Sequence, residues 1–210
     1  TMLNFVSLII GIVALLCAVV AFIPLLGWAN WLIVPLALIG AGGRGSGAVA
    51  NALTASGGPA KLVAMADVVE SKLNNSHQAL SEKFGPMVDV PKDRQFLGFD
   101  AYRHGIDCLR PGDVALLTTH AAFRAPQLEY AISKGVNVFM EKSFASDPAG
   151  IQRILRLGEA AEKKNLKVAT GLMCRHSESR QALIEKIRAG ELGEVHLLRA
   201  AGVDPRDDAE

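Results

Sequence analysis

Hydrophobic and polar positions follow two different patterns along the chain. Before Arg44 no residue is charged, and residues 2–26 form a largely apolar run. This run is longer than the roughly 20 residues that a helix needs to cross a bilayer, so it predicts a transmembrane helix. From Ile39 onward, short apolar runs alternate with stretches of helical periodicity. That alternation is typical of βαβ units in a parallel sheet covered by helices on both faces.

The second pattern predicts a doubly wound, Rossmann-type α/β domain over residues 35–172. Its strands are expected at residues 35–39, 61–66, 95–99, 113–118, 137–140 and 167–170. Helices are expected at residues 44–55, 69–84 and 125–133. Two more are expected to begin at N-cap residues, one at Asp100, ending before Pro111, and one at Asp147. Residues 57–59 (Gly-Gly-Pro) end the first helix, and the last helix carries Ile151, Leu155 and Ala160. An amphipathic helix at 178–188, a strand at 194–199 and a frayed polar tail at 202–210 follow.

The boundary between the two patterns is where the expectations conflict. Residues 1–34 are interpreted as a hydrophobic, membrane-like segment, with a buried core helix as the alternative for residues 2–26. A cleaved secretory signal is disfavoured because no basic residue precedes the apolar run. Pro35 must lie at the start of its strand, since proline cannot donate to an interior ladder. One explanation is a membrane segment joined to an enzyme fragment, by natural fusion or an error of gene assembly. If the N-terminal segment is a genuine anchor, the protein is expected at the membrane with its second part in the cytoplasm. If it is not, a cytoplasmic protein is expected.

Charge and cysteine content narrow the class of ligand. Lys plus Arg number 22 and Asp plus Glu 21, so there is no electrostatic reason to expect nucleic acid as a partner. A small neutral ligand is compatible with this balance. The three cysteines are far apart and form no metal-binding pattern with each other or with histidine. A reducing compartment without disulfides or a bound metal is therefore expected for the second part of the chain.

A glycine motif follows the first predicted strand and opens the first predicted helix. Gly40-Ala41-Gly42-Gly43-Arg44-Gly45 satisfies GxGxxG, in which the glycines permit a tight turn, close approach of a pyrophosphate and helix–strand packing. Asp67 ends the second strand, where a carboxylate can bind ribose hydroxyls and repel a 2′-phosphate. NAD is therefore favoured over NADP. The alternative to a cofactor site is a glycine-rich turn without a ligand, with a solvated carboxylate at the end of the strand. The predicted cofactor contacts in this region are Gly40, Gly42, Gly43, Arg44, Gly45 and Asp67.

Polar residues also follow two later strands, at the edge where an open α/β sheet binds its ligand. Glu141 and Lys142 come directly after the fifth strand, and a lysine there can hold a hydroxyl or relay its proton. On chemistry alone this pair is more often ordinary surface. Thr118, Thr119 and His120 end the fourth strand, either lining the cofactor cleft or capping the loop.

Taken together, these motifs resemble the glucose-fructose oxidoreductase and inositol dehydrogenase (Gfo/Idh/MocA) family. The similarity covers roughly residues 39–200 and includes IGAGGRGSG, VALLTTHAAFR, GVNVFMEKSFASDP and GLMCRHSESRQALIEKIRAGELGEV. In that family a Glu-Lys-Pro loop follows the fifth strand and its lysine assists the substrate. Lys142 matches this lysine, with Glu141 before it, but Ser143 replaces the proline and the loop loses that residue's fixed φ.

The resemblance implies an NAD-dependent oxidoreductase acting on a sugar or polyol, with Lys142 as the catalytic residue and Glu141 beside the cofactor. It also implies a homo-oligomer and a second α/β domain, of which residues 173–210 would be the truncated start. Two alternatives stay open. One is an NAD-using glycosidase of the same fold, and the other is a membrane-attached nucleotide-binding fragment without turnover. Substrate identity and activity without the second domain are left open by the sequence.

Overall fold

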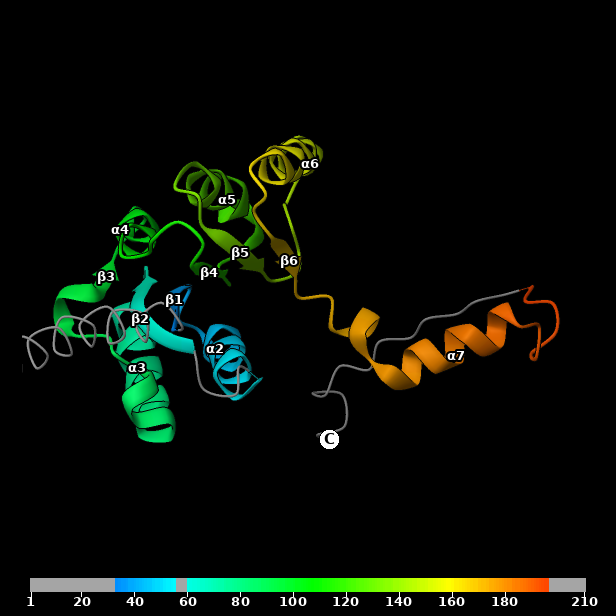
Figure 1. Ribbon diagram of the computed structural model, residues 1–210, viewed down its shortest axis with the longest axis horizontal. Coiled ribbons are helices and arrows are strands. Elements are labelled where there is room, and N and C mark those ends of the chain that lie inside the picture. The colour runs from blue at the N-terminus through cyan, green and yellow to red at the C-terminus, as the bar shows by residue number, and fades with distance from the viewer. Residues whose placement is uncertain (1–32, 56–59, 197–210) are drawn as a thin grey trace, which may run out of the picture. The chain divides into compact units, whose positions relative to one another are not determined.

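The computed structural model describes residues 33–55 and 60–196 of the chain (Figure 1). The predicted membrane segment at residues 2–26, the helix stop at residues 57–59 and the tail at residues 202–210 lie outside these ranges. Within them, no helix is both long and apolar enough to cross a membrane. The chain divides into two compact units, with the boundary in the sequence between Gly171 and Leu172.

The first unit is built on a six-stranded sheet in which every neighbouring pair is parallel. The strands are β1 (Val34–Ile39), β2 (Ala60–Asp67), β3 (Gln95–Leu97), β4 (Val114–Leu117), β5 (Asn137–Met140) and β6 (Val168–Thr170). Their order is β3-β2-β1-β4-β5-β6. The chain thus moves outward from β1 to β3 and returns to the other side of β1 with β4. This is the Rossmann strand order, with its switch point between β1 and β4, and the Rossmann-type part of the predicted fold class is confirmed.

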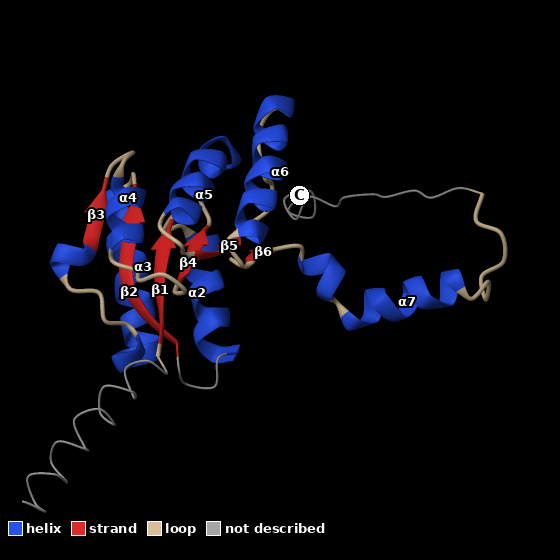
Figure 2. Ribbon diagram, turned by 45° about the horizontal axis from the view of Figure 1, so that its top comes forward, coloured by secondary structure: helices blue, strands red, loops and turns tan. Residues whose placement is uncertain are grey.

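Helices cover both faces of the sheet (Figures 1 and 2). One face carries α2 (Gly43–Ala55) and α3 (Glu70–Phe84), and the other carries α4 (Ala101–Asp107), α5 (Arg124–Ser133) and α6 (Pro148–Lys163). Short 3-10 helices η1 (Gly85–Met87), η2 (Lys92–Arg94) and η3 (Ala121–Phe123) lie in the connections. The second unit contains η4 (Met173–His176) and α7 (Glu178–Arg188).

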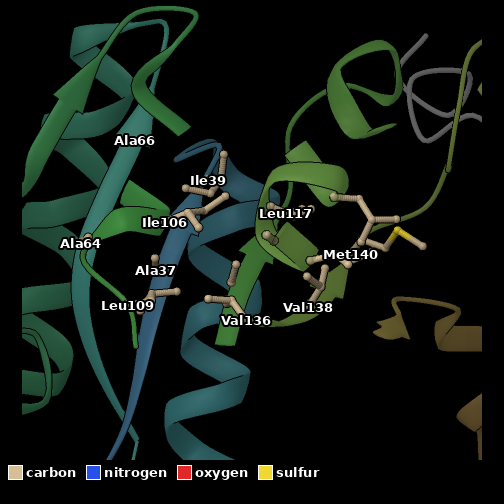
Figure 3. Close-up of a cluster of buried hydrophobic side chains, with 14 of the residues drawn as sticks. Ala37, Ile39, Ala64, Ala66, Ile106, Leu109, Leu117, Val136, Val138 and Met140 are labelled. Carbon is tan, nitrogen blue, oxygen red and sulfur yellow. The ribbon is translucent and has the colours of Figure 1, made fainter. Parts of the chain in front are cut away.

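Alternation along the strands divides the core into two clusters. Ile39 of β1 packs with Ile106 of α4 and Leu117 of β4 on one face, as Figure 3 shows. Leu38, its neighbour in sequence, packs on the opposite face with Val49 of α2. Successive side chains in a strand point to opposite faces, so a strand covered on both sides must be apolar throughout. The uninterrupted apolar run of β1 is explained in this way.

Pro35 is accommodated because of where it lies in β1. It pairs with Lys61 of β2, whereas the ladder with β4 begins one residue later, at Leu36 with Val114. The missing N–H of Pro35 therefore falls at the start of the strand, where β1 still has a single neighbour. In the ladder between β1 and β2, the register shifts between Leu36 and Ala37, just after Pro35. The predicted conflict between proline and strand does not arise.

Other expectations need correction. In α6 the buried side chains are Ile154 and Ala161, whereas Ile151 and Leu155 are exposed, because the helix contacts the sheet through a different stripe. Asp147 caps this helix as predicted, its carboxylate accepting from Gly150 N at 2.7 Å. Asp100 precedes α4 without making a side-chain cap bond. Residues 194–196 of the predicted last strand are irregular, and its remaining residues lie outside the described ranges.

Candidate functional site

A cleft of about 240 Å³ lies at the carboxyl ends of β1, β2 and β4, beside the switch point of the sheet. Loops after four strands and the starts of three helices contribute to its wall. Of the predicted site residues, those that line it are Gly40, Gly42, Asp67, Thr118, Thr119 and His120. In an open α/β sheet, ligands bind at the carboxyl ends of the strands, beside the switch point of the strand order.

The glycine loop is closed by Thr118, which follows β4. The Thr118 hydroxyl donates to the carbonyl oxygen of Gly40 at 2.6 Å. Gly40 has φ +98°, and a Cβ there would lie 2.7 Å from the backbone nitrogen of Thr119. A Cβ on Gly45 would collide with the carbonyl oxygen of Gly40 and lie 2.8 Å from Thr118 Oγ1. Both positions therefore require glycine for the packing of the protein itself.

Gly42 and Gly43 differ from their neighbours in the motif. No heavy atom lies within 4 Å of where a Cβ would sit on either residue. Gly43 is the first residue of α2, so the nearby N–H groups belong to a helix N-terminus, which carries partial positive charge. Intramolecular packing does not require glycine at Gly42. The open space in front of it is suited to an anionic group.

Asp67 is held in place at the end of β2 by two backbone donors. Its Oδ2 accepts from Ala41 N at 2.6 Å, and its Oδ1 accepts from Val69 N at 2.8 Å. The first bond joins the carboxylate to the glycine loop, which follows the neighbouring strand β1. Each oxygen has a further lone pair that can accept from a ligand hydroxyl at the cleft wall.

An apolar part of the cleft wall was missed by sequence reasoning. Val68 and Phe99 are 52% and 73% exposed, and Phe123, at 44%, lies with its ring centroid 6.0 Å from that of Phe99. Lys72 of α3 lines the same region. Large exposed apolar side chains grouped at a cleft indicate a surface that a ligand covers. The Val-Val pair after Asp67 was the available signal, but alone it does not distinguish a cleft from a core.

Thr119 and His120 are fixed by local hydrogen bonds. The Thr119 hydroxyl donates to Gln127 Oε1 at 2.6 Å, and Gln127 is itself buried at the cleft. His120 is the N-cap of η3, with its Nδ1 accepting from Ala122 N at 3.5 Å. The two readings from the sequence, cleft lining and loop capping, thus apply to the same residues.

Glu141 and Arg44 are brought together away from the cleft lining. Arg44 Nη2 lies 2.5 Å from Glu141 Oε1, and this carboxylate is buried whereas Arg44 is half-exposed. Arg124 is fully buried beside them. Its Nη1 donates to the carbonyl oxygen of Glu141, and its Nη2 donates to that of Thr119 at 2.6 Å. Burial lowers the pKa of Arg124, and the negative charge of Glu141 opposes that shift.

Lys142 follows Glu141 at the same edge of the sheet and is exposed. The peptide bond between Lys142 and Ser143 is cis. Lys142 does not line the cleft, and neither do Gly43, Arg44, Gly45 and Glu141. The structure thus places the predicted residues at one sheet edge, in two groups. One group faces the cleft. In the other, Arg44 pairs with Glu141 directly before Lys142, and Gly43 and Gly45 lie in the first turn of α2.

No protein-family model and no curated protein matches the chain. Solved structures do match. A scyllo-inositol dehydrogenase from Lactobacillus casei with bound NAD(H) and scyllo-inositol is 24% identical, with a TM-score of 0.57 over 77% of this chain and 43% of that chain. A myo-inositol 2-dehydrogenase from Lactobacillus plantarum is 19% identical, with a TM-score of 0.59 over 78% and 43%.

A third match is the WlbA dehydrogenase from Chromobacterium violaceum in complex with NADH and UDP-GlcNAcA. It is 20% identical, with a TM-score of 0.56 over 77% of this chain and 41% of that chain. The chain therefore spans about two fifths of the length of these enzymes. The resemblance predicted from the sequence is confirmed at the level of the fold, which this chain shares with part of the inositol dehydrogenases.

Proposed function

We propose that the first unit binds NAD as the cofactor domain of an oxidoreductase acting on a sugar or polyol. The observation that carries this proposal is the open space at Gly42, beside a carboxylate anchored to the same loop. A protein without a ligand here has no packing reason for glycine at this position. Solved relatives of the same fold with bound NAD(H) or NADH support the choice of cofactor.

The residues present fit the parts of a dinucleotide. The pyrophosphate would lie against Gly42 and the N-terminus of α2, where partial positive charge favours it. Asp67 would accept hydrogen bonds from the ribose hydroxyls through its unused lone pairs. The apolar surface around Val68 and Phe99 would cover the base.

Lys142 is the proposed catalytic residue. When bound, NAD supplies a hydride acceptor at its nicotinamide ring, and the protein has to orient the substrate and remove the hydroxyl proton. Lys142 is exposed at the carboxyl end of β5, where it can hold a hydroxyl oxygen or accept its proton. The sugar or polyol class rests on the scyllo-inositol bound by one relative.

Thermal unfolding of the full chain with and without NAD tests cofactor binding. A ligand that binds only the folded form stabilises it by about 2.7 kcal/mol at one hundred times its Kd. We therefore expect the midpoint Tm to rise with NAD concentration, and to rise less with NADP at equal concentration. An unchanged Tm at millimolar NAD would contradict the proposal.

Replacing Asp67 by alanine should weaken NAD binding and reduce the preference for NAD over NADP by about tenfold, because the carboxylate repels a 2′-phosphate. Titration of both dinucleotides by calorimetry measures the change. Asp89→Ala is the matched control, since Asp89 is an exposed carboxylate paired with Lys61 outside the cleft lining. If Asp67→Ala retains the wild-type preference, the assignment of the ribose site is wrong.

A further inference from the structure

Arg124 is unusual among the charged residues of the first unit because its side chain has no exposed surface. Burying a guanidinium is unfavourable unless hydrogen bonds and charges compensate. Its two terminal nitrogens each donate to a carbonyl oxygen, whereas its Nε has no hydrogen-bond partner among the described residues. The side chain of Arg124 therefore acts on the structure through the two backbone segments that carry these carbonyl groups.

The two carbonyl groups belong to loops that leave adjacent strands. Thr119 follows β4 and Glu141 follows β5, and the ladder between these strands ends at Leu117 with Met140. Glu141 N still donates to Leu117 O at 3.0 Å, and beyond that bond no backbone hydrogen bond joins the two loops among the described residues. Arg124 is the first residue of α5, and its guanidinium bridges the two loops beyond the end of the ladder.

Each bridged residue directly precedes a side chain of the proposed site. Thr119 precedes His120, which lines the cleft, and Glu141 precedes Lys142. One planar guanidinium with donors in a rigid fork thus fixes two backbone positions at once. We propose that Arg124 is a positioning residue, which holds His120 and Lys142 in a fixed relation by binding the carbonyl groups immediately before them.

The Glu141 side chain extends this arrangement to the glycine loop. Its carboxylate pairs with Arg44 in the first turn of α2 and is buried against Gly171, where any side chain would collide with it. The backbone of Glu141 is thereby held by Arg124, and its side chain by the element that opens the dinucleotide site. The positioning role rests on the proposed function only for the chemistry of Lys142. The hydrogen bonds of Arg124 to the two loops do not depend on that function.

Hydrogen exchange of the full chain without NAD tests the positioning directly. Lysine keeps the charge of Arg124 but is not a planar fork, so Arg124→Lys should raise amide exchange in residues 118–123 and 141–146 by about tenfold. Exchange in α3 should stay unchanged. Arg153→Lys, which alters an exposed ion pair with Glu129, is the matched control and should leave both loops unaffected. Equal exchange in wild type and Arg124→Lys would overturn the proposal.

A second measurement begins with the wild-type protein, so its first result does not depend on how Arg124→Lys folds. Acylation of lysine amines, followed by peptide mass spectrometry, reports whether Lys142 is held at the cofactor. In wild type, saturating NAD should slow acylation of Lys142 at least about threefold relative to exposed Lys163 on α6. In Arg124→Lys the protection should disappear while the NAD-induced rise in Tm persists.

The outcomes separate the two proposals. If NAD raises Tm but does not protect Lys142 in wild type, Arg124 does not hold that residue at the cofactor and the positioning role is overturned. Equal protection in Arg124→Lys and wild type overturns it as well. If NAD leaves Tm unchanged while Arg124→Lys loosens both loops, cofactor binding is wrong and the positioning role is supported.

Discussion

Gly45→Ala is expected to lower the free energy of unfolding by about 2–3 kcal/mol and to abolish measurable NAD binding. A Cβ at this position would collide with the Gly40 carbonyl oxygen and crowd the Thr118 hydroxyl that closes the loop. Because these are backbone and short side-chain atoms, relief requires α2 to move away from β1. Urea denaturation measures the stability, and calorimetric titration measures the binding.

Gly42→Ala is the matched control within the same motif. Its Cβ would meet no heavy atom within 4 Å, so the free energy of unfolding should change by less than about 1 kcal/mol. NAD binding should nevertheless fall by about tenfold or more, because the methyl group occupies space proposed for the pyrophosphate. If Gly42→Ala binds NAD as wild type does, the open space does not serve a dinucleotide.

Arg124→Met is expected to have the largest effect on stability, a loss of about 3–5 kcal/mol. Methionine fills much of the space but leaves two carbonyl oxygens without their donor. It also removes one of the two positive charges beside the buried Glu141 carboxylate. For a domain of this size such a loss corresponds to a fall in Tm on the order of 10 °C, measurable by calorimetry.

The double variant Arg124→Met/Glu141→Gln separates charge from packing. If the buried carboxylate causes much of the loss, removing its charge should recover about 1–3 kcal/mol relative to the sum of the single effects. Arg153→Met, in the exposed pair with Glu129, should cost less than about 1 kcal/mol. A similar loss for Arg153→Met and Arg124→Met would show that the burial of Arg124 is unimportant here.

Elements bounded by strong local signals were predicted well. The bounds of β5 and α7 agree with those expected, and the other strands of the sheet agree within two residues. These segments are apolar runs or amphipathic stretches, and β1, β3 and β6 are each followed directly by a glycine. Local chemistry therefore determines them. Gly40, Gly42 and Asp67 lie at the cleft, as expected from their positions at strand ends in a parallel sheet, and their contacts with a cofactor stay a prediction.

The remaining features depend on contacts between distant residues. Arg124 would be expected at the surface from its residue type, and its burial results from the approach of two loops in three dimensions. Arg44 and Glu141 are 97 residues apart and were each expected to contact cofactor, yet they pair with each other. The buried side chains of α6, Ile154 and Ala161, were not identified either, since helical spacing alone does not indicate which stripe faces the sheet.

The central position of β1 has a consequence for how the domain folds. Its neighbours are β2, which ends at Asp67, and β4, which begins only at Val114. A growing chain can pair β1 with β2, and β2 with β3, early. Leu36 to Ile39 then present an unpaired, apolar strand edge. Such an edge is a template for aggregation until β4 has been synthesised and has paired with it. Aggregation during synthesis is therefore expected to depend on how quickly residues 114–117 reach that edge.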